Sequence, residues 1–365
     1  MKIYKDLYWS IISPQSLFRA WEVFKSDKRN KPDVAEFELH IEQNIFDLYR
    51  DLKNETYRHG PYKGFWIHDP KIRRIHKAVV RDRVLHHATF SVLNKIFEPT
   101  FINDSYSCRI GKGTHKGVEK VTDMLRVASK NNTRQCYALK CDVRKFFDSV
   151  DHQVLKDILA RKIRDQKTVS LLEEVIESYE KSGTLRERER ERESKTLPLF
   201  TTNTNKGVPI GNLTSQIFAN IYMNEFDQFV KHGLRVKNYA RYTDDFMIIS
   251  EDKGYLEELL PKLQDFLREK LKLELHPNKI SIRKFHEGID FLGYVIFPHY
   301  KLLRSKTKKR VLRNVRKKMA CYQKGLISEN HLHQSMQSYL GVLSHANTYE
   351  LTENLKNQYW FWIKE

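Results

Sequence analysis

The segment RYTDDFMIIS, at residues 241–250, places two adjacent acids inside an otherwise apolar, β-prone run. Ionised Asp244 and Asp245 would be costly to bury unless they were paired or bound a metal ion. Because strand-like residues flank the pair on both sides, we expect a hairpin turn there, with at least one carboxylate pointing off the sheet edge. Another acid, Asp142, ends the second strong apolar strand, which begins at Cys136. If these two strands pair, Asp142 and Asp244 converge.

Converging carboxylates of this kind suit Mg²⁺, which prefers oxygen ligands and keeps water molecules for substrate phosphates. Two such ions roughly 4 Å apart can stabilise the attacking and leaving oxygens of a displacement at phosphorus. The alternative is structural: Asp244 and Asp245 cap a turn, and Asp142 only ends a strand.

The charge balance points to a polyanionic partner. The 365 residues include 65 Lys and Arg against 46 Asp and Glu, a net charge of +19. An excess of this size is typical of proteins that bind nucleic acid, although general solubility is the other explanation. The four cysteines form no C-x-x-C pair, which favours reduced thiols in a cytoplasmic protein. No apolar run approaches the roughly 20 residues of a membrane span, so we expect no membrane partner.

Local patterns divide the chain into helical ends and a mixed middle. Residues 1–55 show helical spacing of apolar side chains, and glycines and prolines punctuate hairpin-like strands in residues 56–80. Strands and helices then alternate, which predicts a four-stranded sheet backed by helices. The RERERERE tract at residues 186–193 fits either an exposed helix extension or a disordered loop. The residues after Tyr294 are basic and helical.

Seven blocks then resemble, in order, the conserved blocks of prokaryotic reverse transcriptases. They are KIRRIHKAVVRDRVLHHA, SYSCRIGKGTHKGVEKV, LKCDVRKFFDSVD, KGVPIGNLTSQIFANIYMNEFD, RYTDDFMIIS, LELHPNKISI and FLGY, spanning residues 71–294. The resemblance implies an α+β, right-hand polymerase fold with fingers, an antiparallel palm sheet backed by helices, and a helical thumb. It also implies an RNA-directed DNA polymerase that uses deoxynucleoside triphosphates, with template RNA and the RNA/cDNA hybrid as its partners.

In that scheme the blocks set four regions. Residues 1–55 form an N-terminal helical extension and residues 56–135 the fingers. The palm covers residues 136–295, with a fingers-like portion and a charged insertion at about 183–205. The thumb covers residues 296–365, and its basic helices are expected to hold the duplex through its phosphates.

The resemblance also assigns roles to individual residues. Asp142 and Asp244 correspond to the metal-binding acids, with the Val143 carbonyl as a further ligand, and Asp245 to the third acid near the primer terminus. The expected cofactor is two Mg²⁺ ions, for which Mn²⁺ can substitute. The positions that correspond to the nucleotide site are Lys71, Arg73, Arg74, Phe147, Ile210, Gly211, Gln216 and Lys279. Those that correspond to the primer and template site are Tyr242, Phe291, Leu292, Gly293 and Tyr294.

Several of these positions have distinct expected tasks. Arginines of the fingers suit bidentate contact with the triphosphate, although a solvated basic strand would look the same. The ring of Phe147 would act as a steric gate against a ribose 2′-OH, whereas Phe146 fits a core aromatic better. Lys279 would lie near the leaving pyrophosphate.

The fourth block departs from most reverse transcriptases. In PIGNLTSQ, Ile210 stands where glutamine is usual and Gln216 where proline is usual. This form resembles the reverse transcriptases of diversity-generating retroelements, which copy a template RNA with frequent errors opposite adenine and act with a ring of a small basic accessory protein. Three alternatives remain: Ile210 is a packing variant in an ordinary enzyme, the enzyme is of the retron or anti-phage type, or the chain is a catalytically silent RNA-binding protein with a polymerase fold.

Overall fold

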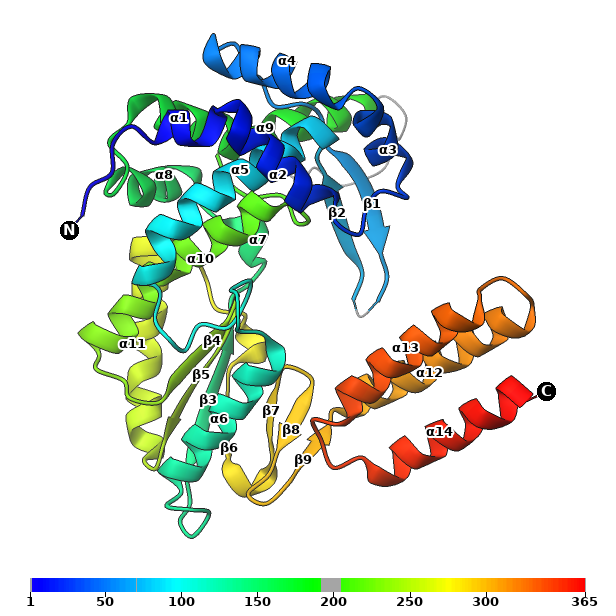
Figure 1. The fold of residues 1–365 in the computed structure, drawn as a ribbon. Helices are drawn as coiled ribbons and strands as arrows, with labels where there is room; N and C mark the ends of the chain where they lie inside the picture. Colours follow the sequence, from blue (N-terminus) through cyan, green and yellow to red (C-terminus); the bar gives the residue numbers. More distant parts are fainter. Residues whose placement is uncertain (1, 70, 192–204, 365) are drawn as a thin grey trace. The chain divides into compact units, whose positions relative to one another are not determined.

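The computed structural model describes the backbone of residues 2–69, 71–191 and 205–364 (Figure 1). The chain divides into two compact units, and each draws on separated stretches of sequence. Unit 1 comprises Met1–Asn103, Val143–Arg235 and Lys262–His276. Unit 2 comprises Asp104–Asp142, Val236–Pro261 and Pro277–Glu365.

Unit 1 is mainly helical. Its helices are α1 (Leu7–Ile12), α2 (Pro14–Lys25), α3 (Pro32–Leu39), α4 (Ile41–Lys53), α5 (Val80–Phe97), α7 (Phe146–Ser149), α8 (His152–Ala160), α9 (Gln166–Glu191) and α10 (Leu213–Gln228). Proline at the first helical position helps to start α2, where the Ser13 hydroxyl also accepts a hydrogen bond from the Ser16 amide. The apolar faces of α1, α2, α4 and α5 meet around fully buried side chains such as Trp21 and Leu85.

A two-stranded antiparallel hairpin extends from this helical core. It consists of β1 (Lys63–Ile67) and β2 (Arg73–Lys77), with Phe65 opposite Ile75 and Ile67 opposite Arg73. This is the hairpin that the glycines and prolines of residues 56–80 predict. Trp66 is 58% exposed, so the hairpin presents a large aromatic surface beside its basic side chains.

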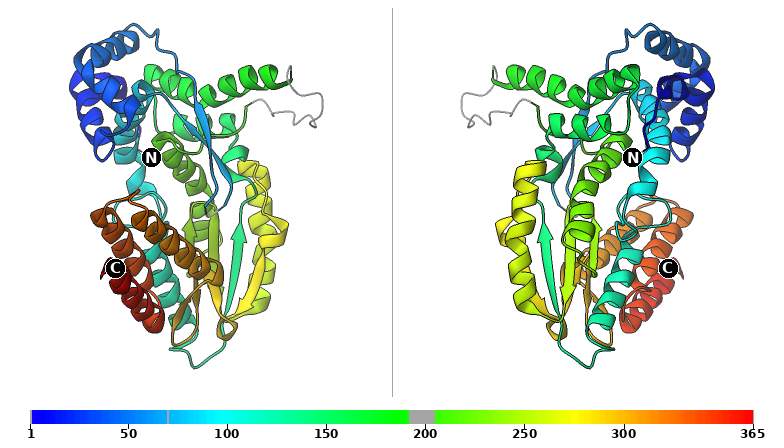
Figure 2. Two further views of the ribbon diagram at one scale, coloured as in Figure 1. Left: turned by 90° about the vertical axis from the view of Figure 1, so that its right-hand side faces the viewer. Right: turned by 90° about the vertical axis from the view of Figure 1, so that its left-hand side faces the viewer.

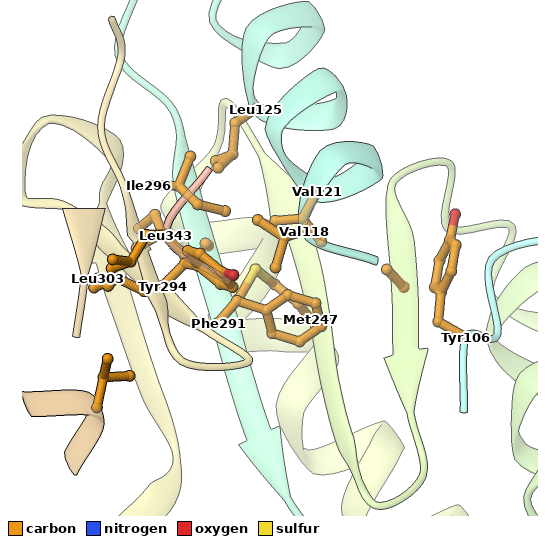
Figure 3. Packing of buried hydrophobic residues seen from close by; sticks show 14 of the residues in the cluster. Tyr106, Val118, Val121, Leu125, Met247, Phe291, Tyr294, Ile296, Leu303 and Leu343 are labelled. Atoms are coloured by element: carbon orange, nitrogen blue, oxygen red, sulfur yellow. The ribbon is translucent and has the colours of Figure 1, made fainter. Parts of the chain in front are cut away.

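Unit 2 is built on a four-stranded antiparallel sheet in the order β4–β5–β3–β6. The strands are β3 (Tyr137–Asp142), β4 (Tyr239–Tyr242), β5 (Asp245–Ser250) and β6 (Ser281–Lys284). Helix α6 (Thr114–Ala128) covers one face, where the buried Val121 and Leu125 meet Met247 (Figure 3). The predicted four-stranded sheet is therefore confirmed. Helix α11 (Lys253–Leu271) follows β5 and contains Pro261.

A second, three-stranded antiparallel sheet follows in unit 2. It contains β7 (Ile289–Phe291), β8 (Tyr294–Ile296) and β9 (Lys301–Leu303). Three helices complete the unit: α12 (Ser305–Gln323), α13 (Glu329–Leu343) and α14 (Tyr349–Lys364). They lie beside one another in all three views (Figures 1 and 2), and Met319, Met336 and Leu355 join them to the core shared with α6.

The antiparallel sheets and surrounding helices confirm the predicted α+β class. Within the RERERERE tract, α9 continues as far as Glu191, and the remaining residues of the predicted insertion, 192–204, lie outside those that the structure describes. In the described parts of the chain, no helix is long and apolar enough to cross a membrane. All four cysteines are free thiols, and burial raises the pKa of Cys141 to about 12, as suits a core residue.

Candidate active site

Three aspartates lie at one end of the β3–β5 pair in unit 2. Asp142, the last residue of β3, lies directly opposite Asp245, the first residue of β5. Asp244 lies in the two-residue turn that joins β4 to β5. The two apolar strands do pair, which is the condition set for the convergence of Asp142 and Asp244, and all three acids lie at neighbouring positions of one unit.

The carboxylates interact electrostatically. Burial first, and then the negative charge of Asp142, raise the pKa of Asp244 to about 6. Burial also raises the pKa of Asp245, and the Lys140 ammonium opposes that rise. Lys279 Nζ lies 2.6 Å from Asp142 Oδ1, so a cation already sits on one of the acids. Crowded, partly desolvated carboxylates of this kind favour the approach of positive charge.

The turn that carries Asp244 has an unusual backbone. Thr243 adopts the left-handed conformation, with φ 57°, which β-branched residues rarely do. Its hydroxyl donates to Ser107 Oγ at 2.6 Å, and its carbonyl accepts from Arg241 Nη1 at 2.9 Å. Strain of about 1–3 kcal/mol persists only where surrounding groups hold the conformation. Ser107 and Arg241 are such groups.

Arg241 itself is fully buried and anchors a neighbouring segment, residues 104–107, to the edge of the sheet. Its Nη2 donates to Ser105 Oγ at 3.1 Å, and its backbone exchanges hydrogen bonds with Asp104 and Tyr106, each 2.9 Å long. Sequence reasoning missed this role. The sequence RYTDD could have indicated it, because a buried arginine in an apolar strand needs a hydrogen-bonding or charged partner.

The FLGY block forms the β7–β8 hairpin of unit 2. Leu292 and Gly293 both have positive φ, 48° and 93°, as a type I′ turn requires. Phe291 is fully buried, and Tyr294 is 3% exposed with its hydroxyl donating to the Val342 carbonyl (Figure 3). The assignment of these four residues to the primer and template site stays a prediction, and their burial divides it between the side chains and the turn itself. The two aromatic side chains shape the turn from the core, and only Leu292 and Gly293 remain available for direct contact.

Tyr242, the other predicted primer residue, ends β4 and is partly exposed. It packs against the core cluster of unit 2, and the Thr114 hydroxyl donates to its phenolic oxygen at 3.4 Å.

The fourth block is docked on the β2 strand in unit 1. The Ile210 carbonyl accepts from the His76 amide at 2.9 Å, and the Asn212 side-chain amide donates to the His76 carbonyl at 2.8 Å. Gly211, with φ +115°, lies so close to β2 that an added Cβ would come within 2.6 Å of Ile75 Cγ2. Glycine is therefore required at position 211, because a side chain there would collide with β2. These contacts hold the fourth block and the β1–β2 hairpin together.

Gly211 and Gln216 line a cavity of about 330 Å³ in unit 1. Phe24, Phe65 and Arg83 are among its other walls. The aromatic and cationic lining has the character of a site for a planar, negatively charged or hydrogen-bonding ligand.

The other predicted nucleotide residues in unit 1 are spread over the hairpin and the start of the palm block. Lys71 and Arg73 are exposed, and Arg74 is partly exposed opposite Trp66. Phe146 is buried, as expected for a core aromatic, whereas Phe147 is partly exposed and its role as a gate stays a prediction. Val143 is buried and forms an isolated bridge with Leu275.

No group of three His, Cys, Asp or Glu side chains in the described part of the chain is arranged to hold a metal ion. Asp142, Asp244 and Asp245 nevertheless supply the oxygen donors that Mg²⁺ prefers. The Oδ1 atom of Asp245 is buried and, among the described residues, has no hydrogen-bond partner. The donor set therefore fits a divalent cation, although the side chains are not gathered around one point.

The paired strands, the acids at their shared end and the block order define a class of nucleic-acid polymerase. Residues 67–296, more than half of the chain, match the family model described as reverse transcriptase (RNA-dependent DNA polymerase). The chain belongs to this family, and its enzyme class is RNA-directed DNA polymerase.

Two proteins from bacteria are similar to this chain over most of its length. The chain is 26% identical over 290 residues to protein YkfC of Escherichia coli, covering 70% of this chain and 71% of YkfC. It is 23% identical over 379 residues to the group II intron-encoded protein LtrA of Lactococcus lactis, covering 85% of this chain and 59% of LtrA. An apo telomerase structure from Candida tropicalis aligns with 73% of this chain and 60% of its own, at 14% identity and a TM-score of 0.47.

Proposed function

We propose that the chain extends a primer along an RNA template by transferring deoxynucleotides to its 3′ end. In this reaction the primer 3′ oxygen forms a bond to the α-phosphorus, the bond from that phosphorus to the β-phosphate oxygen breaks, and pyrophosphate leaves. The observation that carries the proposal is the position of Asp142, Asp244 and Asp245 at one end of the paired strands β3 and β5.

We assign the binding of two divalent cations to these carboxylates, with the Val143 carbonyl as a further donor. Mg²⁺, when bound, stabilises charge on the attacking and leaving oxygens. Two features support this assignment: the raised pKa of Asp244, and the pairing of Asp142 with the Lys279 ammonium. Both are consistent with a site at which a bound cation would offset negative charge. Lys279 would leave Asp142 when a metal ion binds and would then be free to contact the leaving pyrophosphate.

Positively charged and aromatic side chains would position the substrates. We assign the triphosphate to Lys71, Arg73 and Arg74 of the hairpin, since guanidinium groups bind phosphate oxygens in pairs. Phe147 would exclude a ribose 2′-OH. Helix α12 carries eight basic side chains within Lys306–Lys318 and would hold the duplex through its phosphates.

The test is primer extension on matched templates. The purified chain is given one primer annealed to RNA or to DNA of the same sequence, with deoxynucleotides or ribonucleotides and Mg²⁺, Mn²⁺ or EDTA. We expect extension on RNA with deoxynucleotides and a divalent cation, and none in EDTA. Extension with ribonucleotides at an equal rate would contradict the role of Phe147. No extension under any condition, with the primer and RNA bound, would favour the silent RNA-binding protein.

A finer proposal is that this is the adenine-mutagenic enzyme of a diversity-generating retroelement. It rests on Ile210 and Gln216 in the fourth block. Glutamine at position 210 would offer a polar contact to the incoming nucleotide, whereas isoleucine offers only apolar contact. Loss of a polar contact lowers discrimination between correct and incorrect geometry by on the order of 1–3 kcal/mol.

The Ile210→Gln variant tests this proposal. Misincorporation opposite each template base is counted by sequencing cDNA made on a defined RNA by the wild type and the variant. We expect frequent wild-type errors opposite adenine and about ten times fewer in the variant, as the loss of about 1.4 kcal/mol of discrimination implies. The block's docking through the Ile210 backbone carbonyl should survive the substitution. Equal wild-type error rates at all four bases would contradict the proposal.

A retron-type or anti-phage reverse transcriptase is the second candidate, because it would share the catalytic blocks. A near-identical repeat pair that differs at adenines, next to a gene for a small basic protein, would favour the diversity-generating role. That small protein, assembled as a ring, is then the expected partner. The free thiols suit a cytoplasmic location.

A further inference from the structure

A lysine in the middle of β3 has no part in the chemistry described above. Lys140 lies between the buried Leu139 and Cys141, and its side chain is 21% exposed. Its Nζ donates to the main-chain carbonyl of Asp290 at 3.0 Å. The same atom lies 3.8 Å from Asp245 Oδ2 and 3.8 Å from Asp290 Oδ1. Lys140 therefore bridges the third acid of the active site and a carboxylate on β7.

Asp290 links Lys140 to Arg304, the residue that precedes helix α12. Its carboxylate forms an ion pair and hydrogen bond with the Arg304 guanidinium. Arg304 immediately precedes α12, and its amide donates to the Gly293 carbonyl at 2.9 Å, in the turn between β7 and β8. Negative and positive groups thus alternate from Asp245 through Lys140 and Asp290 to the start of the basic helix.

We propose that Lys140 is a positioning residue that couples Asp245 to the base of α12, so that nucleic acid held along α12 sets the placement of this carboxylate. The inference rests on the proposed polymerase function. The side chains of the bridge are 21–37% exposed, which leaves their attraction less screened than that of fully exposed surface pairs. Asp245 Oδ1 has no hydrogen-bond partner in the described residues, so Lys140 is the main restraint observed on that carboxylate.

A purely structural role would predict something different. If Lys140 only compensated buried charge, its removal would lower stability and leave the active fraction of the enzyme with normal kinetics. If it positions Asp245, removal would lower the rate of chemistry in the folded enzyme without weakening primer–template binding. Displacement of a catalytic group by about 1 Å can lower a rate by roughly a hundredfold.

The kinetic test compares Lys140→Met, Lys140→Arg and a control, Lys284→Met. Lys284 is an exposed lysine on β6 of the same sheet, opposite Tyr137 at the other end of β3. Incorporation of one deoxynucleotide is followed on an RNA template, together with primer–template affinity and thermal unfolding. We expect kcat to fall about ten- to a hundredfold in Lys140→Met, with unchanged affinity. Lys140→Arg should recover most of the rate, and Lys284→Met should match the wild type.

Coupling through Arg304 is tested with a double variant. Arg304→Gln alone should also lower kcat, and adding Lys140→Met should cause little further loss, because both changes break the same chain of contacts. Losses that multiply independently would show that the two residues act separately. A wild-type rate in folded Lys140→Met would overturn the proposal outright.

Hydrogen exchange supplies a readout that needs no catalysis. Binding of an RNA–DNA duplex should slow amide exchange in α12 and also in residues 245–250 of the wild type. In Lys140→Met we expect the slowing in α12 to remain and that in residues 245–250 to disappear. If the wild type shows this coupling but never extends a primer, the polymerase proposal fails and the coupling stands. If it extends primers but Lys140→Met keeps the coupling, the role of Lys140 is wrong.

Discussion

At the scale of single residues, Asp244 is the acid of the site whose ionised form the folded protein disfavours most strongly. Its pKa is raised to about 6 by burial and by the negative charge of Asp142. The folded protein therefore binds a proton more tightly at this position than the unfolded chain does. The stability that this proton provides is present at low pH and is lost as the pH rises from about 4 to about 6.

Asp244→Asn should consequently stabilise the metal-free protein at neutral pH. Asparagine resembles the neutral acid, so we expect the free energy of unfolding in EDTA at pH 7.5 to increase by about 1–3 kcal/mol. The gain should fall close to zero near pH 3, where Asp244 is mostly protonated in both states. Urea unfolding at the two pH values measures it. A variant less stable than the wild type at pH 7.5 would contradict this account of the site.

The sequence predicted the acids better than the groups that hold them. Asp142, Asp244 and Asp245 stand out because charged residues interrupt apolar strands. Arg241 and Lys140 interrupt apolar strands as well, but their partners lie far away in sequence: Ser105 for Arg241, and Asp290 for Lys140. Spacing along one strand cannot show which distant carboxylate or hydroxyl completes such a contact.

At the scale of elements, the docking of the fourth block on β2 rests on the absence of a side chain at Gly211. The hairpin and the later helix were both predictable from local patterns. Their direct contact was not, because it depends on the close approach of two backbones separated by more than a hundred residues. The hydrogen bond from His76 to Ile210 joins them.

Replacing Gly211 should weaken the contact between the fourth block and strand β2. Gly211→Ala would place a Cβ 2.6 Å from Ile75 Cγ2 at a positive φ, and we expect a loss of about 1–3 kcal/mol of stability. Gly341→Ala is the matched control, since Gly341 lies in helix α13 with nothing within 4 Å of an added Cβ. It should stabilise the protein by about 0.5–1 kcal/mol. Urea unfolding of both variants gives the comparison, and equal effects would show that the contact with β2 is unimportant.

At the scale of the whole molecule, each compact unit is assembled from three separated stretches of sequence. The regions predicted from the sequence are continuous stretches, and their bounds stay predictions. The fold class was predictable because the order of blocks, the four-stranded sheet and the basic helical end all agreed with one architecture. The net charge of +19 fits a protein whose partner is nucleic acid, but it does not distinguish an enzyme from a binding protein.

That distinction depends on the carboxylates, and one assay tests it most directly. Primer extension on an RNA template with Mg²⁺ is compared for the wild type, Asp244→Asn and the control Asp265→Asn, which changes an exposed aspartate on α11. We predict extension by the wild type and by the control. For Asp244→Asn we predict at least a thousandfold loss, or about 4 kcal/mol of barrier, with primer–template affinity retained. Extension by Asp244→Asn at a rate near that of the wild type would contradict the central claim that these acids form the polymerase active site.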